Sequence, residues 1–248
     1  MVSFDIAGSK VLIVGASSGL GYVLAREFAD AGATVTIVAE VPEIHDAARR
    51  LTEECGCEIR GMLCDITDRA AVAATAEDVG TIDVLVNNAA LTVQTPVADD
   101  SDETARLFER TLNVNVAGLY WMAQAFAKTM DDGGRIIFTS SLWGKTAGVG
   151  FSAYVASKHA MIGLVRTLAA ELGPRGISVN AVCPHAVRTE LSLQASADVV
   201  ETATKAMWLR PGLIPSEDIA GMYLFLASPA ASEITGQAFS VDRGASIF

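Results

Sequence analysis

The sequence contains few residues that bind metals or form disulfides. Its 248 residues include four cysteines and three histidines. Cys55 and Cys57 stand closer together than the Cys-x-x-Cys spacing of zinc and redox sites, and the histidines are dispersed along the chain. We therefore expect no metal site, and thiols that stay reduced in the cytoplasm.

Positive charge and long apolar runs are also scarce. Lysine and arginine total 18 against 29 acidic residues, which gives a net charge of −11, and no basic block occurs. Nucleic acids and anionic membrane surfaces are therefore poor partners. No apolar run reaches the roughly 18 residues of a transmembrane helix. The first six residues lack the basic and apolar regions of a signal peptide, so we expect a soluble cytoplasmic protein.

Aromatic residues make up 6% of the chain, whereas apolar residues make up 51%. Small and branched apolar residues are typical of buried parallel strands covered by close-packed helices. Apolar runs predict strands at 10–14, 34–39, 58–64, 82–86, 135–139, 177–182 and 238–241. Helical patterns lie between them, one ending at Ala31 and others at about 43–54, 68–78, 101–130, 152–172 and 217–227.

This alternation predicts an α/β fold, a Rossmann-type doubly wound parallel sheet of about seven strands with helices on both faces. No linker or repeat interrupts it, so we interpret residues 1–248 as a single domain. The exception is the irregular region at about 186–216, which is rich in Leu, Ala and Ser. A long irregular segment on a compact domain often covers a binding site.

A glycine-rich loop joins the first predicted strand to the first helix. Its sequence is Gly15-Ala16-Ser17-Ser18-Gly19-Leu20-Gly21. Glycines at such a turn allow close backbone approach to a pyrophosphate, and the helix N-terminus offers free N–H groups. The alternative is a glycine-rich turn with no ligand, and the position after a first strand in a βαβ unit argues against it.

The second strand is followed by an acidic residue, Glu40. An acid at this point accepts a hydrogen bond from the adenosine ribose and repels a 2′-phosphate. No arginine or lysine lies in the glycine loop or at 39–45, so we favour NAD over NADP. Asp65, after the third strand, is placed to accept from the adenine amine, and Asn88-Ala89 follow the fourth strand at the ligand-binding edge of the sheet.

Tyr154 and Lys158 are four residues apart on a predicted helix, and Ser141 precedes the tyrosine by thirteen positions. Residues i and i+4 share a helix face. A lysine ammonium near a phenol favours the phenolate and lowers its pKa, which makes the pair a proton-transfer device. The Ser141 hydroxyl could then hold the reacting oxygen of a substrate.

Together these motifs resemble the classical short-chain dehydrogenase/reductase family over essentially the whole chain. The matching positions are Gly15-x-x-x-Gly19-x-Gly21, Asp65, Asn87-Asn88-Ala89, Asn115-Val-Ala-Gly118, Ser141, Tyr154-x-x-x-Lys158, Asn180, Pro184 and Thr189. The resemblance implies that Tyr154 is the general acid/base, that Lys158 binds the nicotinamide ribose, and that Ser141 orients the substrate oxygen. It also implies that Asn115 helps hold a proton-relaying water.

The resemblance completes the expected cofactor site. Thr189 and the backbone of Val187 would bind the carboxamide. The cofactor residues are thus expected to be Gly15, Ser17, Ser18, Gly19, Leu20, Gly21, Glu40, Asp65, Ile66, Asn88, Ala89, Tyr154, Lys158, Pro184, Val187 and Thr189. The family also implies a homotetramer or homodimer, with interfaces at the helices 101–130 and 152–172 and at the last strand.

The chain departs from the family pattern at four points. Ala90 replaces the glycine of Asn-Asn-Ala-Gly, His185 that of Pro-Gly, and Arg243 the first glycine of Val-Asp-Gly-Gly. Glu40 comes one residue later than the family's usual NAD-reading acid, whose place is taken by Ala39.

The substrate wall is expected to be mostly apolar, which indicates a hydrophobic, aromatic or cyclic secondary alcohol or its ketone. It would comprise Val93, Gln94, Leu142, Trp143, Val149, Phe151, His185 and the loop at 186–212, with Ser141, Trp143, Phe151 and His185 central. Core packing of Trp143 and solvent exposure of His185 are the structural alternatives. For the whole protein, an NADPH-preferring carbonyl reductase and a non-catalytic dinucleotide sensor remain open.

Overall fold

The computed structural model describes residues 4–189, 192, 200–201 and 204–247. Over this part of the chain, a seven-stranded sheet has the order β3-β2-β1-β4-β5-β6-β7, and every neighbouring pair is parallel. The strands are β1 (Lys10–Val14), β2 (Thr34–Ala39), β3 (Arg60–Leu63), β4 (Val84–Asn87), β5 (Arg135–Thr139), β6 (Ser178–Pro184) and β7 (Ala238–Val241). The predicted Rossmann-type sheet is confirmed.

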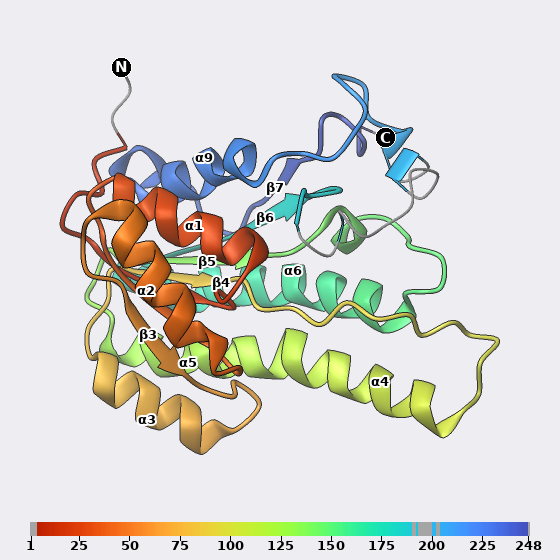
Figure 1. The fold of residues 1–248 in the computed structure, drawn as a ribbon, viewed down its shortest axis with the longest axis horizontal. Coiled ribbons are helices and arrows are strands. Elements are labelled where there is room, and N and C mark those ends of the chain that lie inside the picture. Colours follow the sequence, from red (N-terminus) through yellow and green to blue (C-terminus); the bar gives the residue numbers. More distant parts are fainter. Residues whose placement is uncertain (1–3, 190–191, 193–199, 202–203, 248) are drawn as a thin grey trace.

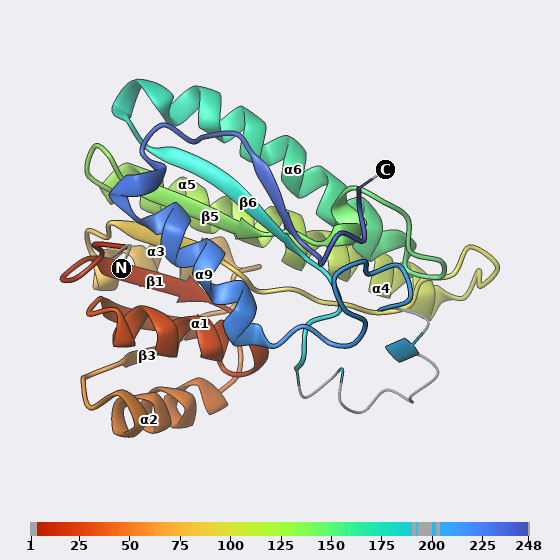
Figure 2. The same ribbon diagram turned by 90° about the horizontal axis from the view of Figure 1, so that it is seen from above.

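Helices cover both faces of this sheet. On one face lie α1 (Gly19–Asp30), α2 (Glu43–Cys55) and α9 (Ser216–Ala227) (Figure 1). On the other face lie α3 (Arg69–Val79), α4 (Asp102–Leu112), α5 (Leu119–Thr129) and α6 (Ser152–Leu172) (Figure 2). Each face has its own buried apolar cluster, because the strands alternate large apolar side chains between the two sides.

The strand order reverses between β1 and β4, which pair from Val11↔Val84 to Val14↔Asn87. The chain moves to β2 and β3 on one side of β1, then returns to β4 on its other side. In open α/β sheets, ligands bind outside the carboxyl ends of the strands at such a reversal. The fold therefore places the ends of β1 and β4 at a ready crevice.

One expected helix, 101–130, is interrupted. Asn113–Gly118 form a π-turn between α4 and α5. Within this turn Asn115 is 1% exposed and uses its amide to hold both backbone groups of Leu91. A π-turn inserts one residue into a helix and is frequent at functional sites. The interruption thus coincides with a tertiary contact that a helical sequence pattern does not encode.

The expected substrate loop is described only in part, since 190–191, 193–199 and 202–203 lie outside the described residues. The C-terminal part of this loop, near Ile214, pairs with the segment that follows β6. Val187 and Ile214 form a parallel bridge, with hydrogen bonds from Arg188 N to Ile214 O and from Ile214 N to Ala186 O. Among the described helices, none is long and apolar enough to cross a membrane.

Candidate active site

The glycine loop is pressed against the end of β4. Gly15 has φ +79°, and a Cβ there would lie 2.5 Å from the Ala89 Cα. A Cβ on Gly21 would lie 2.1 Å from the Gly15 carbonyl oxygen. The Asn88 amide donates a hydrogen bond of 2.9 Å to that same carbonyl. Side chains at either glycine would therefore displace the loop.

Helix α1 begins within this glycine-rich segment, at Gly19. Its N-cap residue, Ser18, makes no side-chain hydrogen bond to the first turn. The first N–H groups of a helix have no intrahelical acceptor and carry a partial positive charge. A pyrophosphate is the kind of anion that such donors hold. The glycine cradle and the uncapped helix end together fit a dinucleotide.

A cavity of about 630 Å³ extends from the glycine loop to α6. Most of the expected cofactor residues line it: Gly15, Ser17, Ser18, Gly19, Leu20, Glu40, Ile66, Asn88, Ala89, Tyr154, Lys158, Val187 and Thr189. Ala90, one of the departures from the family pattern, lines it too. The fold thus brings well-separated parts of the sequence, from Val14 to Thr189, around one ligand-sized space.

Three expected cofactor residues, all described, are not part of this lining. Gly21 lies behind Gly15 and shapes the loop from there. The Asp65 carboxylate accepts hydrogen bonds from the Thr67 backbone N–H at 2.8 Å and hydroxyl at 2.7 Å, so it stabilises a turn. Pro184 is buried at the end of β6.

Sequence reasoning missed a cation in the lining of the cavity, beside Glu40. Arg110, in the last turn of α4, lines the cavity beside Glu40, with Nη2 4.0 Å from Oε1. No motif marks Arg110, because a basic residue in the last turn of a helix is common. Only the fold brings the last turn of α4 next to Glu40, the residue that follows β2.

Where the cavity meets α6, the Tyr154 hydroxyl forms hydrogen bonds with the side chains of Ser141 and Thr92. Burial raises the pKa of the Tyr154 phenol, whereas hydrogen bonds with Ser141 and Thr92 lower it in part. Ser141 also accepts a hydrogen bond of 3.1 Å from the Trp143 backbone N–H. The predicted pairing of Ser141 with Tyr154 is present, and Thr92 is a neighbour that the sequence did not indicate.

Lys158 is 1% exposed and lies one turn after Tyr154 on α6. Its Nζ donates a hydrogen bond of 2.6 Å to the Thr139 carbonyl and lies 5.5 Å from the Tyr154 ring centroid. Burial lowers the pKa of Lys158 to about 7. The expectation that Lys158 pulls the pKa of Tyr154 below its usual value differs from the structure, because burial disfavours both charged forms.

The Asn115 side chain links the Leu91 segment to the helix that carries Tyr154 and Lys158. Its Oδ1 accepts from Leu91 N at 2.7 Å, and its Nδ2 donates to Leu91 O at 2.9 Å and to Ser157 Oγ at 3.0 Å. Ser157 immediately precedes Lys158 on α6. The Asn115 side chain therefore joins the π-turn, the Leu91 segment and α6, and holds the walls of the cavity together.

Two of the expected substrate residues form an aromatic group with Tyr154. The Trp143 ring centroid lies 5.0 Å from that of Phe151 and 6.0 Å from that of Tyr154, edge to face at 79° in the second pair. His185 is half-buried directly after β6. The four central residues of the expected substrate wall are all described, and none of them lines the large cavity: Ser141, Trp143, Phe151 and His185.

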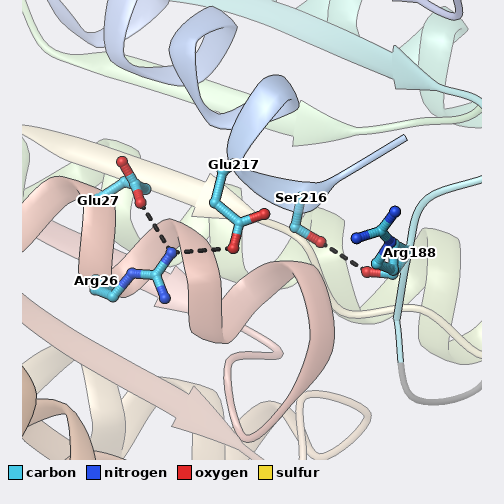
Figure 3. Close-up of polar contacts among 5 residues, drawn as sticks. All are labelled: Arg26, Glu27, Arg188, Ser216 and Glu217. Atoms are coloured by element: carbon cyan, nitrogen blue, oxygen red, sulfur yellow. Dashed lines mark hydrogen bonds and ion pairs between the residues drawn. The ribbon is translucent and has the colours of Figure 1, made fainter. Parts of the chain in front are cut away.

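The segment after β6 that contains Val187 and Thr189 is held against α1. Ser216 Oγ donates to the Arg188 carbonyl at 3.0 Å, and Arg26 on α1 donates to Glu217 at 3.1 Å (Figure 3). Arg26 also contacts Glu27 at 3.0 Å. Backbone N–H donation and Arg26 keep the pKa of Glu217 below its usual value. These contacts fix Thr189 opposite the glycine loop.

Arg243 holds the other end of the expected substrate loop. Its guanidinium donates to the carbonyls of Arg210 at 3.4 Å and Gly212 at 3.0 Å and lies 3.8 Å from the Asp218 carboxylate. Its own carbonyl accepts from Trp208 N at 2.9 Å. The backbone of Arg243 has φ +53°, a left-handed conformation that favours glycine. The departure from the family glycine thus adds side-chain contacts.

The sequence profile of a family described as enoyl-(acyl carrier protein) reductase matches residues 15–246. Dehydrogenase/reductase SDR family member 4 of Homo sapiens is 34% identical, covering 98% of this chain and 90% of the relative. The chain belongs to the short-chain dehydrogenase/reductase family. It is also similar to (+)-borneol dehydrogenase 1 of Salvia officinalis, 32% identical over 99% of this chain and 96% of that one.

Solved structures place the same fold around a dinucleotide. A blue fluorescent protein from a metagenomic library, crystallised in complex with NADPH, superposes with a TM-score of 0.89 at 33% identity. The match covers 98% of this chain and 99% of that one. For this member of the short-chain dehydrogenase/reductase family, the comparison supports a nicotinamide dinucleotide as cofactor without deciding between the phosphorylated and unphosphorylated forms.

Proposed function

We propose that this protein is an NAD-dependent oxidoreductase that interconverts a hydrophobic secondary alcohol and its ketone. The observation on which the proposal rests is one cavity with two chemically distinct ends. A glycine cradle and a helix N-terminus stand at one end, and Tyr154 and Lys158 stand at the other. A binding site for a phosphate-bearing cofactor therefore runs directly into a proton-transfer pair.

A bound nicotinamide dinucleotide would supply the hydride acceptor or donor. Its pyrophosphate would lie on the first turn of α1 beside Gly15 and Gly19, and Val187 and Thr189 would hold the carboxamide. Lys158 would contact the nicotinamide ribose. These assignments agree with the cavity lining, in which each of these residues takes part.

The chain's own residues would move the proton. In the oxidative direction Tyr154 Oη accepts the proton of the substrate hydroxyl while Ser141 holds the substrate oxygen. Lys158, with a pKa of about 7, exchanges a proton readily near neutral pH. Asn115 would help position a water that connects Lys158 with solvent. Positioned acid–base catalysis of this kind contributes roughly 10²–10⁴-fold to the rate.

An apolar, aromatic or cyclic alcohol suits the substrate side. Trp143 packs edge to face against Tyr154, and Phe151 packs against Trp143, so apolar aromatic surface lies next to the proton-transfer group. (+)-Borneol, named for the Salvia relative, is an alcohol of this general kind, and that relative supports the class and not the compound.

An NADPH-dependent carbonyl reductase is the second candidate. The NADPH-bound structural neighbour and the presence of Arg110 in the cavity favour it, and Glu40 opposes it. The ratio of kcat/KM with NAD(H) to that with NADP(H) decides between the two. A non-catalytic dinucleotide sensor is less well supported, because Ser141, Tyr154 and Lys158 are all retained and adjacent.

The direct test is a panel of secondary alcohols and ketones followed by NADH absorbance. Tyr154→Phe is the matched control, since it removes the reacting hydroxyl and keeps the ring that packs against Trp143. We expect turnover of apolar cyclic alcohols that Tyr154→Phe abolishes. Near-wild-type turnover in that variant would refute the mechanism, and tight NAD binding without turnover on any substrate would favour the sensor.

We further propose a cytoplasmic single-domain subunit that assembles as a homotetramer. The support is the family resemblance, in which the helices corresponding to α4, α5 and α6 and the last strand form interfaces. The strand β7 is an outer strand of the described sheet, so one of its edges faces away from β6. Light scattering on the purified protein gives the oligomeric mass directly, and a monomer would contradict this assignment.

A further inference from the structure

Glu40 and Arg110 form an opposite-charge pair at the adenosine end of the cavity. Glu40 directly follows β2, and Arg110 projects from the last turn of α4. Both line the cavity, and their nearest charged atoms are 4.0 Å apart. They are the groups of opposite charge that meet where the ends of β2 and β3 border the cavity.

The pair is loosely held. The Arg110 side chain is 64% exposed and that of Glu40 is 49% exposed. Exposed ion pairs at such separations contribute little to stability, so neither side chain is committed to the other. Each is therefore available to a ligand that enters between them.

The cavity lining has few other charged side chains that could contact a ligand. Of the described residues that line the cavity, Arg110 and Lys158 bear basic side chains, and Glu40 is the acid. Lys158 is buried beside Thr139, at the other end. Arg110 is thus the guanidinium that the cavity offers to an adenosine ribose, and a guanidinium binds phosphate oxygens in a bidentate geometry.

We propose that Arg110 is a cofactor-selecting residue that acts together with Glu40. With Glu40 charged, Arg110 orients its carboxylate toward the 2′-hydroxyl of an unphosphorylated ribose. Once the charge of Glu40 is removed, Arg110 becomes the ligand of a 2′-phosphate. Selection between NAD and NADP is then a property of the pair and not of Glu40 alone. This inference rests on the dinucleotide site of the proposed function.

The test compares two ligands that differ by the 2′-phosphate alone, adenosine 5′-monophosphate and adenosine 2′,5′-bisphosphate. Their affinities are measured by calorimetry for the wild type, Glu40→Gln, Arg110→Gln and the double variant. The control is Arg106→Gln, which removes the same charge one turn earlier on α4, where Arg106 pairs with Glu103 at the surface. Circular dichroism melting confirms that each variant folds.

We expect Glu40→Gln to raise the affinity for the bisphosphate by about tenfold relative to the monophosphate, which is the effect of one charge-assisted hydrogen bond. The double variant should lose that gain. Arg106→Gln should leave the ratio of the two affinities within about twofold of wild type, because salt screens an exposed charge one turn away from Arg110. The gain should also shrink as salt is raised.

A gain in bisphosphate affinity that persists in the double variant would overturn the proposal. A change in the ratio of the two affinities that is as large in Arg106→Gln as in Arg110→Gln would also overturn it. Failure of the wild type to bind either nucleotide would overturn both this proposal and the cofactor assignment. Binding that follows the expected pattern in a protein without alcohol or ketone turnover would overturn the oxidoreductase proposal and leave the selecting role of Arg110 intact.

Discussion

The buried amine of Lys158 donates its hydrogen bond of 2.6 Å to the backbone carbonyl of Thr139, the last residue of β5. This single contact holds a side chain that is 1% exposed. The sheet therefore positions the amine, and the aromatic ring of Tyr154 lies within 5.5 Å of it. The arrangement costs the folded protein stability, because a buried ammonium loses its hydration.

The stability of the protein should therefore depend on pH through Lys158. Its pKa falls from 10.5 in the unfolded chain to about 7 in the folded one. Between these values the unfolded state binds more protons, so stability rises with pH. We expect the wild type to gain stability relative to Lys158→Met between pH 7 and pH 9 in urea unfolding. Parallel stability curves for the two proteins would contradict this.

Alcohol oxidation should accelerate toward alkaline pH. Burial raises the pKa of Tyr154, so the phenolate that accepts the substrate proton is scarce at pH 7. We expect kcat for oxidation to climb as pH increases, while ketone reduction, which uses the neutral phenol, does not. The measurement is a pair of pH–rate profiles, and an oxidation rate independent of pH would exclude Tyr154 as the base.

Replacement of Gly21 by alanine should abolish dinucleotide binding. The new Cβ would lie 2.1 Å from the Gly15 carbonyl and 2.7 Å from the Asn88 amide nitrogen, so the cradle must shift. Gly221→Ala on α9 is the matched control, because nothing lies within 4 Å of its added Cβ. That change should leave binding intact and stabilise the helix by about 1 kcal/mol. Calorimetry with NAD and thermal melting separate the two outcomes.

Replacement of Arg243 by glycine should weaken substrate binding and spare the cofactor. The change removes hydrogen bonds to Arg210 and Gly212 that hold the exit of the substrate loop, although it relieves the left-handed backbone. We expect KM for the alcohol to rise about fivefold, which corresponds to a loss of about 1 kcal/mol of binding free energy. The affinity for NAD should stay within about twofold. A selective loss of NAD affinity would show that Arg243 serves another part of the site.

Much of the fold is legible in the sequence because buried parallel strands are continuous apolar runs. The expected ranges 10–14, 34–39, 135–139 and 238–241 match the observed strands residue for residue. The predicted strand at 58–64 is shorter, Arg60–Leu63, since its burial is incomplete and pairing with β2 ends it. The π-turn at Asn113–Gly118 was not predicted, because it depends on the contact of Asn115 with Leu91.

The candidate site divides in the same way. Residues in local motifs, such as Gly15 and Tyr154, could be found from spacing alone, and they do line the cavity. Arg110 and Thr92 could not, because Arg110 lies on a helix that no motif marks, and Thr92 belongs to no motif although its neighbours in the chain were expected at the site. The role of His185 and the residues of the loop after it stays a prediction.

The hydrogen bond between Asn88 and Gly15 joins residues 73 positions apart in the sequence. The contact that shapes the glycine loop therefore cannot form until β4 has paired with β1. Contacts of such long range form late, because the loop between them must close first. A nascent chain that ends before β4 has every glycine of the loop and still lacks the Asn88 amide that contacts it. A ligand that binds the folded protein and not the unfolded chain stabilises the folded state. A saturating dinucleotide should therefore shift the folding equilibrium toward the complete sheet.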